Sequence, residues 1–525
     1  MTPAGGVGPR SPGRAFVGRL EAALAGPLAD AAFVAALGAL HTLAFVHTWA
    51  WPGHLIAVAL LAWRVDRASP RRAFFLGLAF GTAWLCAGTW WMFVSMHRYG
   101  GLPAVLAALA VLGLSVFLSL YLAAALTLAA RWRARAAWRR ALVFTGGWLL
   151  AELARGVIFT GFPWVASGYA YVDSPLAGFA PWLGVYGLGA VATALAALFG
   201  HADLRRPRVW LGPGLVTAAV LGIGALAGRL DFTEASGSLR VTLLQGNVPQ
   251  SEKFSARHVP EALANFAVQL EAARGDLVVG PETVIPLLPE HLDPAFWQGL
   301  LARFREPGRS ALFGLPLGSD RAGYTNSAAG LSAATQSLPE GFYRYDKHHL
   351  VPFGEFVPPG FRWFTRMMNI PLGDFNRGPL VAPSFVVRGE RVAPNICYED
   401  LFGEELAARF RPAASAPTLL ANISNIGWFG ETVAVAQHLQ ISRMRTLELQ
   451  RPMIRATNTG TTAVIDHRGH VVASLAPFTR GQLDAVVQGR TGITPFVGWA
   501  SRFGLWPMLA LGLALMLAFG AGRRP

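Results

Sequence analysis

Lysine and cysteine are scarce in this chain, and one of each lies in a stretch rich in reactive side chains. Only Lys253 and Lys347 among the 45 basic residues are lysines, and the two cysteines are Cys86 and Cys397. An ammonium group offers a compact charge and an adjustable pKa that a guanidinium cannot, and a thiolate is a strong nucleophile. Together with Glu282 upstream, the order Glu, Lys, Cys predicts a thiol-nucleophile acyl-transfer site.

Each of these residues has a chemical task in such a site. Cys397 follows an apolar run predicted to be a strand, where layered α/β folds expose nucleophiles. Lys347 could lower the pKa of the thiol or stabilise the oxyanion, and Glu282 could move protons. Glu355 and Glu399 follow the lysine and the cysteine closely, so they could orient the lysine or contact the acyl acceptor.

The composition indicates a membrane protein. Hydrophobic residues make up 53% of the chain and charged residues only 14%, which is too apolar for an ordinary soluble protein. The net charge of +15 would suit a nucleic-acid partner. However, the arginines gather in short clusters between apolar runs, where cationic residues orient membrane segments. We therefore expect a lipid bilayer and no nucleic acid as partner.

Apolar runs long enough to cross a membrane, about 20 residues each, dominate the first 230 residues and return near the C-terminus. The candidate spans lie near 28–48, 50–64, 73–97, 102–130, 140–160, 176–200, 209–229 and 503–520. They predict a division into a cytoplasmic tail without regular structure, a transmembrane region of about seven helices, a catalytic domain and a C-terminal transmembrane helix, at 1–25, 26–230, 231–490 and 497–522.

The loops between the spans alternate in charge. Arginine clusters near 64–72, 131–140 and 205–208 occupy every second loop, and the intervening loops are almost free of basic residues. Because basic loops stay on the cytoplasmic side, both termini are expected in the cytoplasm and the catalytic domain on the opposite, periplasmic side.

The middle region alternates short β-rich runs with amphipathic helical patterns, which predicts a layered α/β domain. The expected strands are 240–245, 276–280, 311–314, 392–397, 418–423, 454–458 and 463–466. The expected helices are 259–273, 293–305, 402–411 and about 432–450.

Three motifs in this region carry a family resemblance. They are Gly280-Pro-Glu282, Tyr345-Asp-Lys347-His-His-Leu-Val-Pro-Phe-Gly-Glu355 and Ile396-Cys397-Tyr398-Glu399. They resemble the three signatures of the nitrilase (carbon–nitrogen hydrolase) superfamily. With seven preceding spans and one following span, the whole chain resembles the apolipoprotein N-acyltransferase family of bacterial envelopes, the membrane-bound branch of that superfamily.

The resemblance implies a polytopic α-helical membrane bundle of about eight spans that bears a nitrilase-like αββα sandwich. It assigns Glu282 as general base, Lys347 as the group that stabilises the tetrahedral intermediate, and Cys397 as nucleophile. Further active-site positions of the family match Glu355, Glu399, Tyr398 and Asn326. No metal or cofactor is implied, and nothing demands more than a monomer.

The implied reaction is a ping-pong acyl transfer. Cys397 would take an acyl chain from a phospholipid such as phosphatidylethanolamine and form a thioester. The acyl group would then pass to the α-amino group of the diacylglyceryl-cysteine at the N-terminus of an apolipoprotein, which gives a triacylated lipoprotein. The enzyme would lie in the bacterial inner membrane.

A segment beyond Lys347 is unusually rich in large apolar residues. We expect a membrane-facing lid formed by Trp363, Phe364, Met367 and Met368, whose neighbouring arginines would meet lipid phosphates. The alternative is a buried loop or helix of the domain core. Phe254, where the family often has Trp, is a further candidate lipid contact.

Three other functions remain open at this point. A membrane-anchored nitrilase-type amidase could use the same triad on a small substrate, although a simple hydrolase has little use for eight spans. A transporter or channel would need ionisable residues within the spans, and only Glu152 and Arg155 stand out. A homologue that binds lipoproteins without chemistry would not need Glu282, Lys347 and Cys397 intact.

Overall fold

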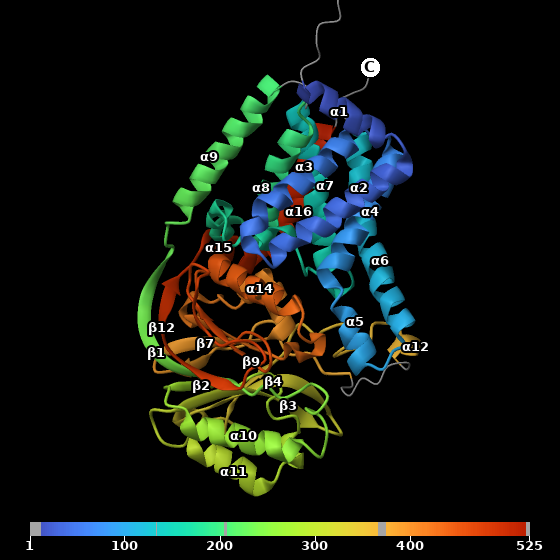
Figure 1. Cartoon of the computed structure of the whole chain (residues 1–525). Coiled ribbons are helices and arrows are strands. Elements are labelled where there is room, and N and C mark those ends of the chain that lie inside the picture. Colours follow the sequence, from blue (N-terminus) through green and yellow to red (C-terminus); the bar gives the residue numbers. More distant parts are fainter. Residues whose placement is uncertain (1–11, 133, 204–206, 366–373, 521–525) are drawn as a thin grey trace, which may run out of the picture.

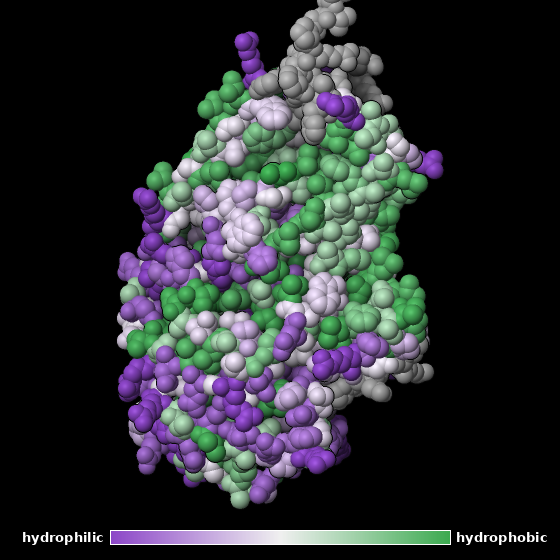
Figure 2. Space-filling model, in the orientation of Figure 1, coloured by the Kyte–Doolittle hydropathy of each residue, from purple (hydrophilic) through white to green (hydrophobic). Residues whose placement is uncertain are grey.

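The chain consists of a bundle of apolar helices at one end and two stacked β-sheets at the other (Figure 1). The computed structural model describes all residues except 1–11, 133, 204–206, 366–373 and 521–525. Hydrophobic residues cover most of the helical end in the view of Figure 2, and hydrophilic residues cover the sheet end. The contrast fits a bundle surrounded by lipid and a domain surrounded by water.

The bundle is built from Ala-, Leu- and Gly-rich segments. Its helices are α2 (Pro27–Leu40), α3 (Trp51–Arg67), α4 (Pro70–Thr89), α6 (Ala104–Arg131), α7 (Ala137–Val157), α8 (Ala180–Gly200), α9 (Leu211–Ala227) and α16 (Trp506–Gly520). Several have proline in the first turn, where its missing N–H costs nothing. The tail expected without regular structure instead carries helix α1 (Pro12–Ala23).

The number of spans is close to the expected eight. Five described helical stretches are long and apolar enough to cross a membrane, and two bent pairs could each be one more span. The expected second span, α3, has 17 residues, at the short end of the range for a full crossing. The described helices therefore support five to seven spans by length and composition.

Both bent pairs lie where the bundle meets the sheets. Helix α4 turns by 61° into α5 (Met92–Val94) and the π-helical turn η3 (Ser95–Tyr99). The expected C-terminal helix of 497–522 is divided into α15 (Pro495–Phe503) and α16, which meet at 94°. Gly504, at φ 53°, makes this second corner, a conformation that favours glycine.

The other end of the molecule is a pair of six-stranded sheets. The first has the order β12-β1-β2-β3-β4-β5 and the second β11-β10-β9-β8-β7-β6. The strands are β1 (Thr233–Gln245), β2 (Leu277–Val279), β3 (Ser310–Ser319), β4 (Gly323–Leu331), β5 (Tyr343–Asp346), β6 (Phe385–Val387), β7 (Glu390–Ile396), β8 (Leu419–Ser424), β9 (Met453–Thr457), β10 (Ala463–Ile465), β11 (Val471–Ser474) and β12 (Gly481–Gly492).

Helices cover the outer face of each sheet. Helices α10 (Val259–Ala272) and α11 (Pro294–Arg303) share a buried apolar cluster with β3, whereas α13 (Gly403–Ala408) and α14 (Ala434–Leu449) share one with β8. A third cluster lies between the sheets and draws residues from β1, β2, β7 and β8. The layers therefore form the expected αββα sandwich.

Both chain connections to the helical part leave the sandwich at one edge. Strand β1 follows α9, and β12 precedes α15. The two strands pair antiparallel along their length, with Thr233 opposite Gly492. The first and last strands of the domain therefore lie side by side at the edge where the tethers attach (Figure 1).

Helix α14 is enclosed between the second sheet and the helical bundle. Nearly all of its residues are buried, and it belongs to an apolar cluster that extends from Trp148 of α7 to Met444 of α14. Within this contact, Gln437 Oε1 accepts hydrogen bonds from Trp91 Nε1 at 3.0 Å and Trp164 Nε1 at 2.8 Å, and Gln437 Nε2 donates to Gly88 O at 2.9 Å. A single amide therefore joins the sandwich to two segments of the membrane part.

We expect Gln437→Leu to destabilise this contact. The change leaves the indole N–H of Trp164 buried without an acceptor, which costs about 1–3 kcal/mol. The melting temperature of the full chain in detergent should fall. Gln298→Leu, on the exposed face of α11, is the control and should leave it unchanged. Equal melting of both variants would show that the amide does not stabilise the contact.

Candidate active site

The three predicted catalytic residues each follow a strand. Glu282 comes shortly after β2, Lys347 directly after β5, and Cys397 directly after β7. Strands β2 and β5 belong to the first sheet and β7 to the second. Glu282 and Lys347 are buried and Cys397 is half-buried. The site therefore lies at the junction of the two sheets.

Lys347 and Asn326 hold two carboxylates together. Lys347 Nζ lies 2.9 Å from Glu355 Oε1 and 3.8 Å from Glu282 Oε1. Asn326 Nδ2 donates to the same two oxygens, at 2.6 Å and 2.8 Å. The backbone N–H of Asn425 donates to Glu282 Oε2 at 2.8 Å. Both carboxylates therefore have hydrogen-bond donors in the interior of the site, as buried polar groups require.

Cys397 occupies a strained corner between β7 and a short 3-10 turn. Its φ of 53° is rare for a residue with a side chain, and such strain is often found at active sites. Its carbonyl oxygen lies 3.2 Å from Nε2 of His438. Arg455 donates to Nδ1 of the same ring at 2.8 Å, so Nε2 carries the proton and donates to Cys397. His438 therefore supports the corner and is not the base.

The surroundings keep the thiol protonated and the lysine charged. Burial and the Glu282 carboxylate raise the pKa of Cys397, which Lys347 lowers and Glu355 raises further. A hydrogen bond from the Asn425 backbone lowers it slightly. Burial also lowers the pKa of Lys347, but Glu355 and Glu282 outweigh this and hold it above its usual value. Attack by Cys397 therefore needs a base that takes the thiol proton.

Glu399 positions the backbone of the site. Its carboxylate accepts hydrogen bonds from Tyr345 Oη, from the His348 and His349 backbone N–H groups and from Ile396 N, at 2.8, 2.8, 3.3 and 2.7 Å. Two of these donors flank Lys347 and one precedes Cys397. This arrangement indicates that Glu399 fixes the lysine strand against the cysteine strand, and that Glu355 is the carboxylate that orients Lys347.

Tyr398 connects the site to the membrane part. Its hydroxyl donates to Gly161 O at 2.9 Å, in the segment that follows α7. Arg155 of α7 holds the same segment through the carbonyl oxygens of Phe162 and Trp164, at 2.9 and 2.6 Å. Glu152 pairs with Arg155. These two intramembrane charges therefore support the loop that contacts the residue next to Cys397.

The candidate lipid contacts fall in two places. Phe254 stacks on Trp428, with ring centroids 6.2 Å apart, and Trp428 meets Tyr99 of η3 edge-on at 6.0 Å. Phe254 therefore lies at the contact between the sandwich and the bent helix. Trp363, in the short helix α12 (Arg362–Thr365), is 61% exposed. Met367, Met368 and the side chain of Phe364 lie outside the described residues.

Two contributors to the site were not assigned a role from the sequence. The Asn425 backbone N–H contacts both Glu282 and Cys397, and Lys253 Nζ donates to the Glu282 carbonyl at 2.9 Å. A backbone donor leaves no mark in side-chain types. The scarcity of lysine did single out Lys253, but no motif connected it to Glu282.

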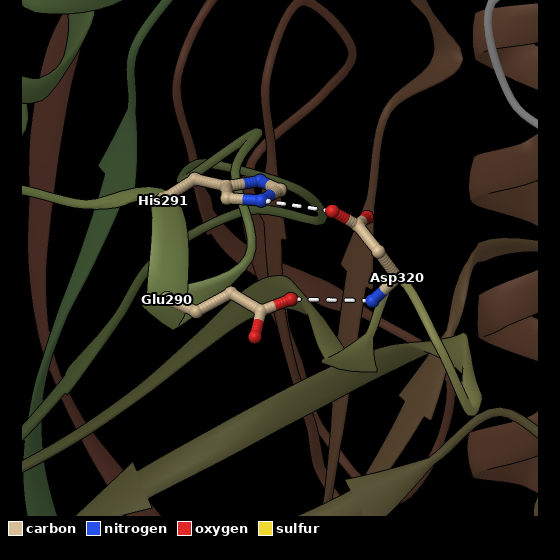
Figure 3. A group of neighbouring side chains, drawn as sticks. All are labelled: Glu290, His291 and Asp320. Carbon is tan, nitrogen blue, oxygen red and sulfur yellow. Dashed lines mark hydrogen bonds and ion pairs between the residues drawn. The ribbon is translucent and has the colours of Figure 1, made fainter.

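A separate group of possible metal ligands lies on the surface (Figure 3). Donor atoms of Glu290, His291 and Asp320 lie within 4.8 Å of one another, and all three residues are exposed. His291 Nε2 lies 3.1 Å from Asp320 Oδ2, and Asp320 N donates to Glu290 at 3.2 Å. These contacts fasten the β3–β4 turn to the loop after β2, which accounts for the group without a metal.

Comparisons with known families agree with the two-part architecture. Residues 37–198 match the apolipoprotein N-acyltransferase N-terminal domain, and residues 240–494 match the carbon–nitrogen hydrolase domain. A carbon–nitrogen hydrolase of known structure from Helicobacter pylori is similar at 16% identity and a TM-score of 0.35, over 52% of this chain and 94% of that chain.

Full-length relatives give a more specific assignment. An apolipoprotein N-acyltransferase from Verminephrobacter eiseniae is 50% identical over 90% of this chain and 92% of its own length. A second, from Ralstonia nicotianae, is 47% identical over 98% of both chains. With both domains matched and nearly the full length covered, this chain belongs to the apolipoprotein N-acyltransferase family of membrane proteins.

Proposed function

We propose that this chain transfers an acyl chain from a membrane phospholipid to the N-terminal amine of diacylglyceryl apolipoproteins. The observation that carries the proposal is a cysteine that interacts electrostatically with the paired Glu282 and Lys347 and is joined through Tyr398 to the membrane part. The full-length relatives named apolipoprotein N-acyltransferase support the same reaction. A small-molecule amidase is not favoured, because it would need neither the membrane domain nor this contact.

In the first half-reaction the thiol attacks the ester carbonyl of a phospholipid such as phosphatidylethanolamine. Glu282 accepts the proton of Cys397 while sulfur bonds to the carbonyl carbon. The ammonium of Lys347 stabilises the negative oxygen of the tetrahedral intermediate. Collapse breaks the bond to the glycerol oxygen, which takes the proton from Glu282. The products are a Cys397 thioester and a lysophospholipid.

In the second half-reaction the free α-amine of the diacylglyceryl-cysteine attacks the thioester. Glu282 takes a proton from the attacking nitrogen, and Lys347 again stabilises the oxyanion. Collapse expels the thiolate of Cys397, which recovers its proton from Glu282. The product is an amide-linked, triacylated lipoprotein. The same base and the same cation therefore serve both halves of the ping-pong cycle.

The proposed location follows from the substrates and from the arginine clusters. Both lipid substrates keep their acyl chains in the bilayer, so the site must open at its surface. We place the 26–230 helices and the C-terminal helix in the bacterial inner membrane. Both termini then lie in the cytoplasm and the 231–490 domain in the periplasm. A monomer contains all the groups that the reaction uses.

The thioester should form on Cys397 alone. Full-length protein in detergent, incubated with phosphatidylethanolamine labelled in its sn-1 chain and no acceptor, should gain a label that hydroxylamine removes. Cys397→Ala should gain none, since it lacks the sulfur. Cys86→Ala changes the other cysteine and should be labelled like the wild type. An unlabelled wild type whose Cys397 still alkylates would overturn the phospholipid donor.

Asn326→Asp should disable the base without changing the shape of the side chain. The change removes the amide N–H groups that donate to Glu282 and Glu355 and places a third acceptor against them. Loss of a buried hydrogen-bond donor costs about 1–3 kcal/mol, so we expect acyl-enzyme formation at pH 7 to fall by at least about tenfold. Asn376→Asp, at an exposed position, is the control. Equal rates in both variants would contradict Glu282 as base.

The proposed lid gives a prediction about lipid binding alone. Changing Trp363, Phe364, Met367 and Met368 to Ser should raise the apparent KM for phospholipid several-fold, because the apolar contact with acyl chains is lost. Alkylation of Cys397 by iodoacetamide should stay the same. Val268→Ser, exposed on α10, serves as control. Unchanged lipid kinetics in the fourfold variant would mean that this segment is not a lid.

A further inference from the structure

Lys253 is buried in the site but has no part in the reaction described above. Only 4% of its surface is exposed, and its Nζ donates to the backbone carbonyl of Glu282 at 2.9 Å. It lies next to Phe254, in the segment that follows β1. It is one of only two lysines beside 43 arginines, and the other is Lys347. Both lysines therefore contact the same catalytic glutamate.

The ammonium of Lys253 is buried without a direct ion pair. In the described part of the chain, no carboxylate oxygen lies within 4.0 Å of its Nζ. Burial of a charge is costly unless other groups compensate. The compensation here comes from the Glu282 carbonyl and from the charge of Glu282, which raises the pKa of Lys253, as a thiolate at Cys397 also does. The ammonium charge of Lys253 is therefore stabilised by Glu282, a residue of the site.

The charge balance of the site requires a second cation. Glu282 and Glu355 are two carboxylates, and among the described residues Lys347 is the cation that pairs with them. Transfer of the Cys397 proton to Glu282 moves one of these negative charges onto sulfur and leaves their number at two. Lys347 alone would face two negative charges before and after the transfer. With Lys253 present, two positive charges oppose them.

Lys253 also holds the backbone corner that aims Glu282. Thr283, the next residue, has a φ of 50°. On the other side the corner lies against Gly314 of β3, where a Cβ would approach Thr283 N to 2.5 Å. The Glu282 backbone is therefore fixed by close packing on one face and by the Lys253 hydrogen bond to its carbonyl.

We propose that Lys253 is a positioning residue of this site: its ammonium holds the Glu282 carbonyl and supplies the second positive charge that stabilises the negative charge on Cys397 when Glu282 takes its proton. The inference rests on the proposed role of Cys397 as nucleophile. It assigns to the second lysine a role through Glu282 and Cys397, without contact with the substrate.

The Lys253 ammonium can stabilise negative charge on Cys397 only at a pH at which Lys253 is protonated. Burial lowers its pKa to about 8, although the charges of Glu282 and Cys397 oppose the shift. Lys347 and Glu355 complete the charged groups of the site. The ammonium form therefore predominates at pH 7 and is lost as the pH rises through about 8. Acyl-enzyme formation by the wild type should decline over that range.

The test separates the effect of the Lys253 charge on Cys397 reactivity from the effect of its hydrogen bond to Glu282. In a Cys86→Ala background, so that Cys397 is the single thiol, the alkylation rate by neutral iodoacetamide is measured from pH 6 to pH 10. Lys253→Gln keeps a donor for the Glu282 carbonyl but removes the charge, Lys253→Met removes both, and Lys253→Arg keeps the charge. Arg257→Met removes an exposed cation of the same segment and is the matched control.

We expect both uncharged variants to alkylate at least about tenfold more slowly at pH 7, because a loss of one positive charge beside the thiol disfavours the thiolate. Lys253→Arg should recover part of the rate, and Arg257→Met should match the parent because an exposed charge is screened. The decline of acyl-enzyme formation above pH 8 should disappear in Lys253→Gln.

An alkylation profile of Lys253→Gln that coincides with the parent profile would overturn the inference. Melting temperatures show whether each variant is folded, and Lys253→Gln decides the question if Lys253→Met does not fold. Failure of this inference is distinct from failure of the proposed function. If only this inference fails, the wild type still forms a labelled thioester and Lys253→Gln has the parent alkylation profile. If the proposed function fails, the wild type gains no label.

Discussion

Burial of like charges next to a thiol is the constraint on which the rest of the site depends. A general base must stay ionised, yet a carboxylate removed from water tends to protonate. Here two carboxylates share the amide of Asn326 and the ammonium of Lys347, and Asn425 donates its backbone N–H. Burial and the charge of Glu282 together raise the pKa of Cys397. In the proposed reaction a base must therefore take the thiol proton before or during attack.

The constraint also explains why so much of the fold converges on a few atoms. The donors and charges come from several strands of both sheets and from the loops that follow them. Glu399 ties the Lys347 strand to the Cys397 strand through four hydrogen bonds. The hydrogen bond from Tyr398 to Gly161 connects the cysteine corner to the loop that follows α7. The membrane part is thus a component of the site as well as an anchor.

The sequence predicted the architecture, and the structure brings the three predicted catalytic residues to the junction of the two sheets. All seven expected strands are present, because each is a short apolar run bounded by turn residues. The sequence missed β4, β5, β6, β11 and β12. Among these, β11 is largely exposed and β12 alternates irregularly between exposed and partly buried positions, so neither has the apolar run of a core strand. The bends at Thr89 and Gly504 were also missed, since hydropathy does not report direction.

The details of the site were less accessible. Asn326, Glu355, Tyr398 and Glu399 were identified by resemblance, but their contacts could not be. Tyr398 bonds to a residue 237 positions away, and Glu399 is occupied by local backbone donors. Such contacts depend on tertiary packing that no local pattern encodes. Lys253 was noticed for its rarity, and only its distance from Glu282 gave it a role.

The pairing of β1 with β12 has a consequence for synthesis. The first strand of the sandwich emerges early and its edge partner emerges last, close to the membrane-bound C-terminal helices. Until residue 481 has been made, one side of β1 is an open strand edge, and open edges promote association between chains. A chain that stops short of β12 would therefore be held at the membrane with this strand edge exposed and open to association with another chain.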